Sequence, residues 1–465
     1  MNRILSLCIT VLALTAGIGI AADDEKRPPN IVFIIADDLG YGDLSCYGAP
    51  DLKSPNIDAL FEAGMRFDQF YANCPVCSPS RAAILTGFYP DNAGVPGVIR
   101  TPLPDLSTNW GKLREDVPLM PAVLKKAGYH TAIVGKWHLG MEAPDRPNDR
   151  GFDFFHGFLG DMMDDYYDHL RHGKHYMRKN LEPVNPEGHA TDIFTQWASD
   201  YLRERGSAEH RDQPFYLYLA YNAPHTPIQP PQDWYEKVKA REPGIDDARA
   251  KLVALIEHLD HGVGQVIETL KETGAWDNTL IVFTSDNGGQ ESVGARNAPL
   301  RGGKQDMWEG GIRVGTCVVW PGKIAPGQVN GEHVSLGMDF YPTLAEIAGA
   351  KIEHEIDARS FAPLLLGQPF EEAARELYWV RLEGNQKYGG IPYHAVRIGD
   401  WKLLRNTPFE PYEMFNLSQD TGEMTPVPRQ KAPKKYDELF KSLLKHINLA
   451  GKVPWQRTEE GHNAD

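Results

Sequence analysis

The chain has 465 residues, of which 42% are hydrophobic and 24% are charged. This composition is typical of a globular protein with a sizeable core, and it excludes a disordered chain, a collagen and a multi-span membrane protein. Acidic residues number 63 against 48 basic ones, so the formal net charge is -15. Nucleic acid is therefore not expected as a partner, because phosphate backbones are bound by basic surfaces.

The first 21 residues have the pattern of a secretory signal peptide. Arg3 precedes an apolar run from Ile4 to about Ile20, and Gly19 and Ala21 provide the small residues of a cleavage site. An uncleaved membrane anchor is the alternative, because the run is nearly long enough to span a bilayer. We expect cleavage and export to the periplasm or the exterior, with no stable membrane insertion of the mature chain.

From Asn30 onward, short apolar runs alternate with helical patterns, which indicates an α/β sheet. Continuous apolar runs of this length suit parallel strands that are covered on both faces. The expected strands are Ile31–Ala36, Thr131–Val134, Phe215–Tyr221, Leu280–Thr284 and Cys317–Trp320. The expected helices are Asn56–Ala63, Met120–Ala127, Ile193–Glu204, Ala248–Thr273 and Met338–Ala348.

The pattern changes at about Arg359, where shorter strands with tight turns begin. These strands are expected at Leu377–Val380, Tyr393–Ile398, Trp401–Arg405 and Tyr412–Asn416, and an amphipathic helix at Tyr436–Ile447. We therefore expect a signal peptide (1–21), an α/β domain with a large, mixed but mostly parallel sheet between helices (22–358), and a smaller domain of antiparallel sheet plus helix (359–465).

Acidic loops follow two of the expected strands. Asp37 and Asp38 come directly after the first strand, and Asp286 and Asn287 come after Leu280–Thr284. Ligands of open α/β sheets bind beyond the carboxyl ends of the strands, where these carboxylates would repel one another without a cation. A hard divalent ion with oxygen ligands removes that repulsion. For either loop alone, a turn or a helix cap is the alternative.

A third segment, Cys77-Ser78-Pro79-Ser80-Arg81, opens an apolar helical stretch. Pro79 suits the first turn of a helix, so Cys77 is expected at a helix N-terminus, where the helix dipole favours an anion. A buried structural cysteine and a thiolate nucleophile are the alternatives. The sequence also leaves open a disulfide between Cys46 and Cys74.

The segment at Cys77 resembles the C-x-P-x-R signature of type I, formylglycine-dependent sulfatases, which belong to the alkaline-phosphatase-like superfamily. Other segments are similar to the same family, namely Ile34–Asp43, Gly135–Gly140, Asn222–His225, Asp286–Gly288 and Leu300–Lys304. The resemblance extends from Asn30 to about Glu423 and covers arylsulfatases and N-acetylgalactosamine-6-sulfatase-like glycan sulfatases. It implies an alkaline-phosphatase-like fold and a sulfuric ester hydrolase.

The resemblance also implies a mechanism. A formylglycine-generating maturation enzyme would oxidise Cys77, and one hydroxyl of the hydrated aldehyde (a gem-diol) would attack sulfur to leave a sulfated enzyme intermediate. His225 would protonate the leaving alcohol, and His138 would act as the base that releases sulfate. The implied catalytic residues are Cys77, Arg81, Lys136, His138, His225 and Lys304. One Ca²⁺ ion, with Mg²⁺ as the alternative, would be held by Asp37, Asp38, residue 77, Asp286 and Asn287.

The expected substrate is a sulfated polysaccharide or oligosaccharide, because an exported enzyme meets extracellular polymers. The segment His156–Tyr176 is dense in Asp, Tyr, His and Arg, which suit sugar rings and further sulfates, although a polar loop without a ligand is the alternative. Two other functions stay open. One is a phosphodiesterase or phosphonate monoester hydrolase of the same superfamily, and the other is a non-catalytic glycan-binding protein with an unmodified Cys77.

Overall fold

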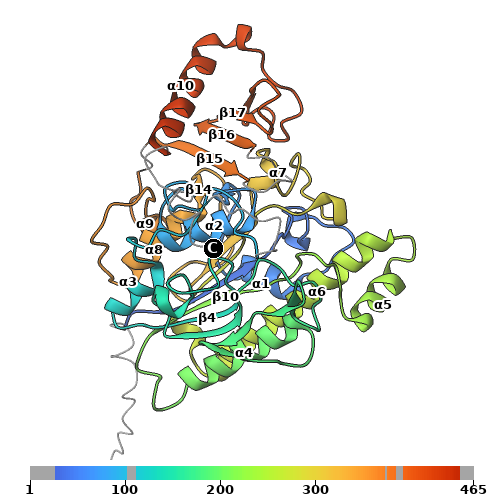
Figure 1. Ribbon diagram of the computed structural model, residues 1–465, viewed down its shortest axis with the longest axis vertical. Coiled ribbons are helices and arrows are strands. Elements are labelled where there is room, and N and C mark those ends of the chain that lie inside the picture. Colours follow the sequence, from blue (N-terminus) through green and yellow to red (C-terminus); the bar gives the residue numbers. More distant parts are fainter. Residues whose placement is uncertain (1–26, 102–110, 372–373, 384–390, 451–465) are drawn as a thin grey trace, which may run out of the picture.

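The computed structural model describes residues 27–101, 111–371, 374–383 and 391–450, so the expected signal peptide lies outside the described residues. Figure 1 shows a large sheet with helices on both faces and a smaller sheet beyond it. Within the described ranges, no helix is long and apolar enough to cross a membrane. The predicted fold class, a mostly parallel α/β sheet with an antiparallel sheet after it, is confirmed.

Four parallel strands form the centre of the large sheet, and all four were predicted from apolar runs. In spatial order they are β11 (Thr279–Ser285), β1 (Asn30–Ala36), β10 (Phe215–Ala220) and β4 (His130–Lys136). Ile34 and Ile35 of β1 are both fully buried, on opposite faces of the sheet. Burial on both faces explains why these strands are continuously apolar. Their carboxyl ends lie in a row at one edge.

The outer strands run in mixed directions. On one side lie β5 (Phe154–Phe158), which is parallel to β4, and the antiparallel strands β8 (Met177–Lys179) and β9 (Glu182–Pro183). On the other side lie β12 (Thr316–Val319), β2 (Met65–Phe67) and β13 (Gln328–Asn330). The prediction that the β12 run is parallel is wrong, since β12 pairs antiparallel with β11. An apolar run predicts that a strand is buried, but it does not predict the direction of that strand.

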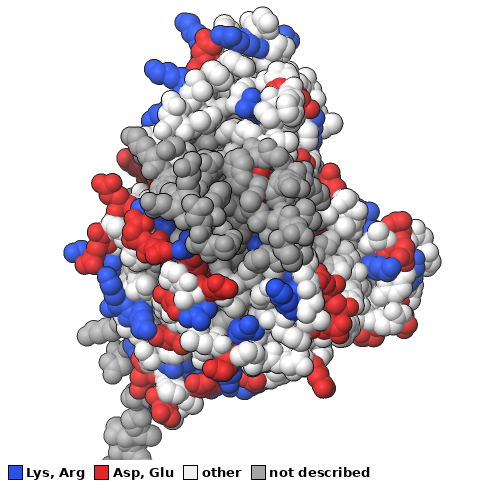
Figure 2. Space-filling view, viewed as in Figure 1, with Lys and Arg blue, Asp and Glu red and all other residues white. Residues whose placement is uncertain are grey.

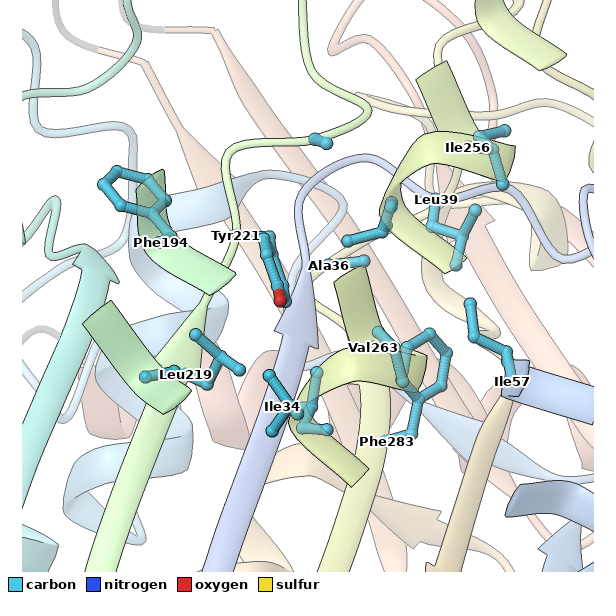
Figure 3. Close-up of a cluster of buried hydrophobic side chains, with 14 of the residues drawn as sticks. Ile34, Ala36, Leu39, Ile57, Phe194, Leu219, Tyr221, Ile256, Val263 and Phe283 are labelled. Carbon is cyan, nitrogen blue, oxygen red and sulfur yellow. The ribbon is translucent and has the colours of Figure 1, made fainter. Parts of the chain in front are cut away.

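Helices cover both faces of this sheet (Figure 1). One face is covered by α1 (Pro55–Ala63), α4 (Ala190–Arg205) and α6 (Asp247–Glu272), with α5 (Gln232–Arg241) packed on α6. The other face is covered by α2 (Cys77–Thr86), α3 (Met120–Lys126), α8 (Phe340–Ile347) and α9 (Ala362–Leu365). Figure 3 shows Ile34 and Phe283 of the sheet next to Val263 of α6 in this core.

The C-terminal sheet is an antiparallel meander with one helix on it. Its elements are β15 (Glu376–Leu382), β16 (Pro392–Ile398), β17 (Trp401–Arg405), β18 (Glu413–Asn416) and α10 (Pro433–Ala450). Its core includes Trp379, Leu403 and Leu439, and it continues into Tyr71 and Ile312 of the larger part. Shorter elements complete the fold, namely β3 (Phe70–Tyr71), β14 (Ser335–Leu336), β6 (Leu170–Arg171), β7 (Lys174–His175) and α7 (Glu309–Ile312).

Asp91, in the loop after α2, is a buried carboxyl group. Its side chain is 2% exposed, and its Oδ1 accepts the backbone N–H of Asn92. Burial raises the pKa of Asp91 to about 7. An unfolded aspartate titrates near 4, so the native protein holds an extra proton between these two values. The stability of the fold therefore falls as the pH rises through this window.

Asp91→Asn should raise the free energy of unfolding at pH 8 more than at pH 5. The amide carries no charge, so the variant avoids the cost of ionising a buried carboxyl group at the higher pH. Urea unfolding of both proteins at the two pH values measures this difference. The same gain at pH 5 and at pH 8 would show that ionisation of Asp91 does not limit stability.

Candidate active site

The acidic residues of the site lie at the carboxyl ends of two neighbouring strands. Asp37 and Asp38 follow β1, Asp286 and Asn287 follow β11, and these strands pair along their whole length. The backbone N–H of Asp38 donates to Asp286 Oδ1 at 3.2 Å, and Asn287 Nδ2 donates to Asp38 Oδ1 at 2.7 Å. The structure thus brings together the two loops that the sequence singled out.

Cys77 is the first residue of α2, as the position of Pro79 predicted. Its Sγ lies 3.9 Å from Asp38 Oδ1. One turn further along the helix, Arg81 is completely buried, with Nε 2.9 Å and one terminal nitrogen 2.8 Å from Asp286 Oδ2. We therefore expect Arg81 to act on substrate only indirectly, by holding this carboxylate in place.

Lys136 and His138 come from the end of β4. Lys136 Nζ lies 2.6 Å from Asp37 Oδ2. His138 Nε2 lies 2.8 Å from the carbonyl oxygen of Ile99, and because a carbonyl can only accept, Nε2 carries the proton. The buried Nδ1 has no hydrogen-bond partner among the described residues. Burial and Lys136 hold the pKa of His138 well below its usual range, so its neutral ring offers a lone pair as a base.

His225 and Lys304 form a second pair. Lys304 Nζ donates to Asp38 Oδ2 at 2.6 Å and to His225 Nε2 at 2.9 Å, while His225 Nδ1 lies 2.7 Å from the carbonyl oxygen of Thr226. Burial and Lys304 lower the pKa of His225. Burial opposes the charge on Lys304, but Asp38 holds the pKa of Lys304 above its usual range. The shared proton of this pair is therefore bonded to Lys304 Nζ, and His225 Nε2 accepts it in a hydrogen bond.

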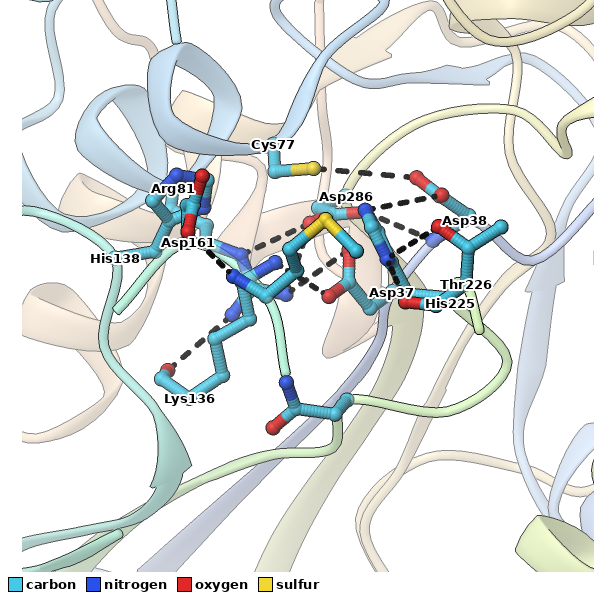
Figure 4. Close-up of polar contacts among 12 residues, drawn as sticks. Asp37, Asp38, Cys77, Arg81, Lys136, His138, Asp161, His225, Thr226 and Asp286 are labelled. Carbon is cyan, nitrogen blue, oxygen red and sulfur yellow. Dashed lines mark hydrogen bonds and ion pairs between the residues drawn. The ribbon is translucent and has the colours of Figure 1, made fainter. Parts of the chain in front are cut away.

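Figure 4 shows how these side chains surround Cys77. His138 and Asp161 lie on one side of the thiol, and Asp38 and His225 lie on the other. The implied catalytic residues come from four separate segments of the chain, and the fold brings them together near residue 77. This arrangement can place a base and a proton donor on opposite sides of a reacting group.

The donor atoms of the site fit a divalent cation. Asp37 Oδ1 and Asn287 Oδ1 are buried and accept no hydrogen bond from the described part of the chain. Ligand atoms of Asp37, Asp38, Cys77 and His225 lie within 4.8 Å of one another. Buried carboxylate and amide oxygens are the ligands that Ca²⁺ and Mg²⁺ take in proteins. Of the predicted ligands, Asp37, Asp38 and residue 77 are close enough to share one ion, and Asp286 and Asn287 are hydrogen-bonded to Asp38 beside them.

The cysteines limit the chemistry of the unmodified chain. Burial raises the pKa of Cys77 well above its usual range, so the thiol stays protonated and is a poor nucleophile. In the unmodified chain without a bound cation, burial therefore favours the thiol over the thiolate. Cys46 and Cys74, for which the sequence left a disulfide open, are both free, and Cys74 Sγ lies 3.2 Å from the carbonyl oxygen of Val380.

Several side chains of the segment His156–Tyr176 have structural roles. Arg171 pairs with Asp161 at 2.8 Å and with Asp164 at 2.8 Å. The Tyr166 hydroxyl is buried, 2.8 Å from the carbonyl oxygens of Asn222 and His225, and thus supports the turn that carries the histidine. These side chains are engaged within the protein, so any contact with substrate falls to the exposed residues of the same segment.

Sequence reasoning missed the residues that surround His138. Ile99 supplies the carbonyl that fixes its tautomer, and Asp161 is buried beside it, held by the Thr101 hydroxyl at 2.6 Å. Ile99 lies in no motif, and Asp161 lies in the segment His156–Tyr176, which the sequence suggested for substrate contacts and not for a contact with His138. Their positions near His138 result from chain segments far apart in sequence, and no local pattern signals them.

Comparisons with known proteins agree with this geometry. A family model described as Sulfatase matches residues 29–350, and one described as N-sulphoglucosamine sulphohydrolase, C-terminal, matches residues 303–450. N-acetylgalactosamine-6-sulfatase of Mus musculus is 32% identical over 435 residues, which are 88% of this chain and 78% of that protein. Arylsulfatase A of Homo sapiens is 35% identical over 467 residues, 89% of this chain and 85% of that protein.

A solved structure is also similar along almost the whole chain. Ps i-CgsB in complex with k-i-k-neocarrahexaose has a TM-score of 0.82 and 31% identity, and the match covers 94% of this chain and 97% of that one. The matches thus span the large sheet, the site at its edge and the C-terminal sheet. The chain belongs to the type I sulfatase family of the alkaline-phosphatase-like superfamily and is a sulfuric ester hydrolase.

Proposed function

We propose that this sulfatase is exported and removes sulfate from a sulfated polysaccharide or oligosaccharide. The observation that carries the proposal is the arrangement around residue 77, with a neutral histidine base on one side and the Lys304–His225 pair on the other. The similarity to an N-acetylgalactosamine-6-sulfatase and to a protein solved with a neocarrahexaose supports a glycan as the substrate. Figure 2 shows acidic and basic side chains intermixed on the visible face.

We propose that residue 77 acts as formylglycine, formed from Cys77 by a maturation enzyme. Burial raises the pKa of the Cys77 thiol and so makes it a poor nucleophile, whereas a hydrated aldehyde has two hydroxyls with separate tasks. One hydroxyl receives the sulfuryl group from the ester. When the other loses its proton, the aldehyde re-forms and sulfate leaves. A serine or cysteine has no second hydroxyl and would need an attacking water instead.

Two histidines then have distinct parts in the proposed reaction. His138 Nδ1 accepts the proton from the second hydroxyl, because its Nε2 proton is committed to the carbonyl of Ile99. His225 passes the proton that it receives from Lys304 to the oxygen of the leaving alcohol. Asp38 Oδ2 accepts a hydrogen bond from Lys304 Nζ at 2.6 Å and so fixes the position of the ammonium group that supplies this proton.

We propose Ca²⁺ as the metal, with Mg²⁺ as the alternative. Asp37, Asp38, residue 77, Asp286 and Asn287 would hold the ion. When bound, it would supply positive charge to the oxygens at the reacting centre. Lys136 pairs with Asp37 and Arg81 with Asp286, which keeps these two carboxyl groups in place around it.

A panel of defined sulfated oligosaccharides tests the proposed substrate class. We expect release of sulfate from at least one glycan. A matched pair of aryl sulfate and aryl phosphate esters serves as the control, and the sulfate ester should be hydrolysed faster. Activity confined to the phosphate ester would identify a phosphoester hydrolase on the same fold and would contradict the proposal.

Cys77→Ala should abolish turnover while leaving the fold intact, because it removes one small buried group. Intact-mass measurement of the parent protein, made together with a maturation enzyme, should show formylglycine in place of the cysteine. Cys74→Ala is the matched control, since Cys74 is also buried but bonds only to a backbone carbonyl. Full activity from protein with an entirely unmodified Cys77 would refute the mechanism.

The loss of activity in His225→Ala should increase with the pKa of the leaving alcohol. A sugar alkoxide needs a proton in the transition state, so we expect a loss of ~10²–10⁴-fold on a glycan sulfate. Nitrophenolate leaves without help, so the loss on nitrophenyl sulfate should be much smaller. His138→Ala should slow both substrates alike, because it acts after the alcohol has left. Equal losses for His225→Ala on both substrates would mean that the acid is another group.

Asp37→Ala should lower both the metal content and the activity, because the remaining oxygens cannot hold the ion in place. Elemental analysis of the purified variant measures the metal content, and sulfate release measures the activity. Asp260→Asn is the control, since Asp260 is a buried carboxyl whose Oδ1 caps α1 through the Ile57 N–H at 2.7 Å. A metal-free protein with full activity would count against the proposed site.

A further inference from the structure

The loop that carries Lys304 is tied to the C-terminal sheet on both sides of this lysine. Before it, a terminal nitrogen of Arg301 donates to the carbonyl oxygen of Glu423 at 2.9 Å. After it, the Met307 N–H donates to Asn406 Oδ1 at 2.5 Å. Asn406 directly follows β17, so the backbone that presents Lys304 is held by a separate sheet.

A buried ion cluster reinforces this connection. Lys402 of β17 lies 2.9 Å from Glu309 Oε1 and 2.8 Å from Glu423 Oε1, and all three side chains are fully buried. Glu423 Oε2 also accepts the N–H of Glu309 at 2.6 Å. Glu309 is the first residue of α7, and the loop with Lys304 ends there. Removal of Lys402 would leave Glu423 without this cation, and Glu309 with Arg313 at 3.6 Å as its basic neighbour.

Movement at Glu309 would reach the active site through close backbone contacts. The loop closes on itself where the N–H of Gly310 donates to the carbonyl of Arg301 at 2.8 Å, and the N–H of Lys304 donates to the carbonyl of Gly289 at 3.0 Å. A Cβ atom at Gly288 would lie 1.8 Å from the carbonyl oxygen of Gly310. The loop from β11 that carries Asp286 and Asn287 thus rests directly on α7.

We propose that Lys402 is a positioning residue for Lys304, and that through Glu309 and Glu423 the C-terminal sheet sets where the Lys304 ammonium meets His225 and Asp38. The inference rests on the proposed role of Lys304 and His225 as proton donors. It gives the C-terminal sheet a part in the reaction, although none of its residues in this cluster touches the reacting atoms. A misplacement of about 1 Å at a reacting group costs about 10²-fold in rate.

Lys402→Met should therefore lower kcat on a glycan sulfate by about 10²-fold, with a smaller change in KM. The loss on nitrophenyl sulfate should be much smaller, as for His225→Ala, because proton donation is what suffers. Arg205→Met is the matched control. Arg205 is a buried arginine of α4, far from this loop. One of its terminal nitrogens donates to Gln213 Oε1 at 2.9 Å. It should lose thermal stability without any dependence of kcat on the leaving group.

A double-mutant cycle with Lys304→Met separates positioning from general loss of stability. If Lys402 acts through Lys304, adding Lys402→Met to Lys304→Met should change the residual kcat on the glycan sulfate little, because the group it positions is already gone. Losses that multiply in the double variant would overturn the inference, as would a folded Lys402→Met with the kinetics of the parent. Full activity of Lys304→Met would instead refute the proposed proton donor.

Asn406→Ala covers the case in which Lys402→Met does not fold. It removes only the acceptor of the Met307 N–H and leaves the ion cluster in place. We expect a smaller loss of kcat than for Lys402→Met, with the same dependence on the leaving group. Parental kinetics in a folded Asn406→Ala would overturn the inference that the C-terminal sheet positions this loop.

Discussion

Three buried carboxylates at the ends of β1 and β11 are the constraint on which the rest of the site depends. Asp37, Asp38 and Asp286 meet in a region without solvent, where like charges cannot remain ionised unless they are paired. Each has a basic partner from a different element. Lys136 comes from β4, Lys304 from the loop before α7, and Arg81 from the second turn of α2. Satisfying these charges therefore fixes where these elements lie.

The same burial decides the protonation of the groups around residue 77. Desolvation disfavours any charge that lacks a partner, so the Cys77 thiol and the His138 ring are both neutral. Lys304 keeps its charge because Asp38 is in contact with it. The site thus holds a base and a proton source close together without their neutralising each other, since each is bonded to a different partner.

The connection between the two sheets follows from the same principle. Lys402 is as deeply buried as the active-site lysine Lys136, and it too is held by carboxylates. A buried ion cluster is a poor source of stability compared with apolar packing, but it fixes the geometry of the groups that it joins. In this protein the cluster joins β17 to the end of the loop that carries Lys304, so the smaller sheet supports this loop at the edge of the site.

Features that depend on local patterns could be predicted from the amino-acid sequence. Apolar runs predicted the four central strands, Pro79 predicted the start of α2 at Cys77, and the acidic loops predicted which strand ends meet. The antiparallel direction of β12, the tautomer of His138 and the position of Lys402 could not be predicted in this way. Burial and turn chemistry are encoded residue by residue, whereas these three features depend on contacts between segments that are distant in sequence and close only after folding.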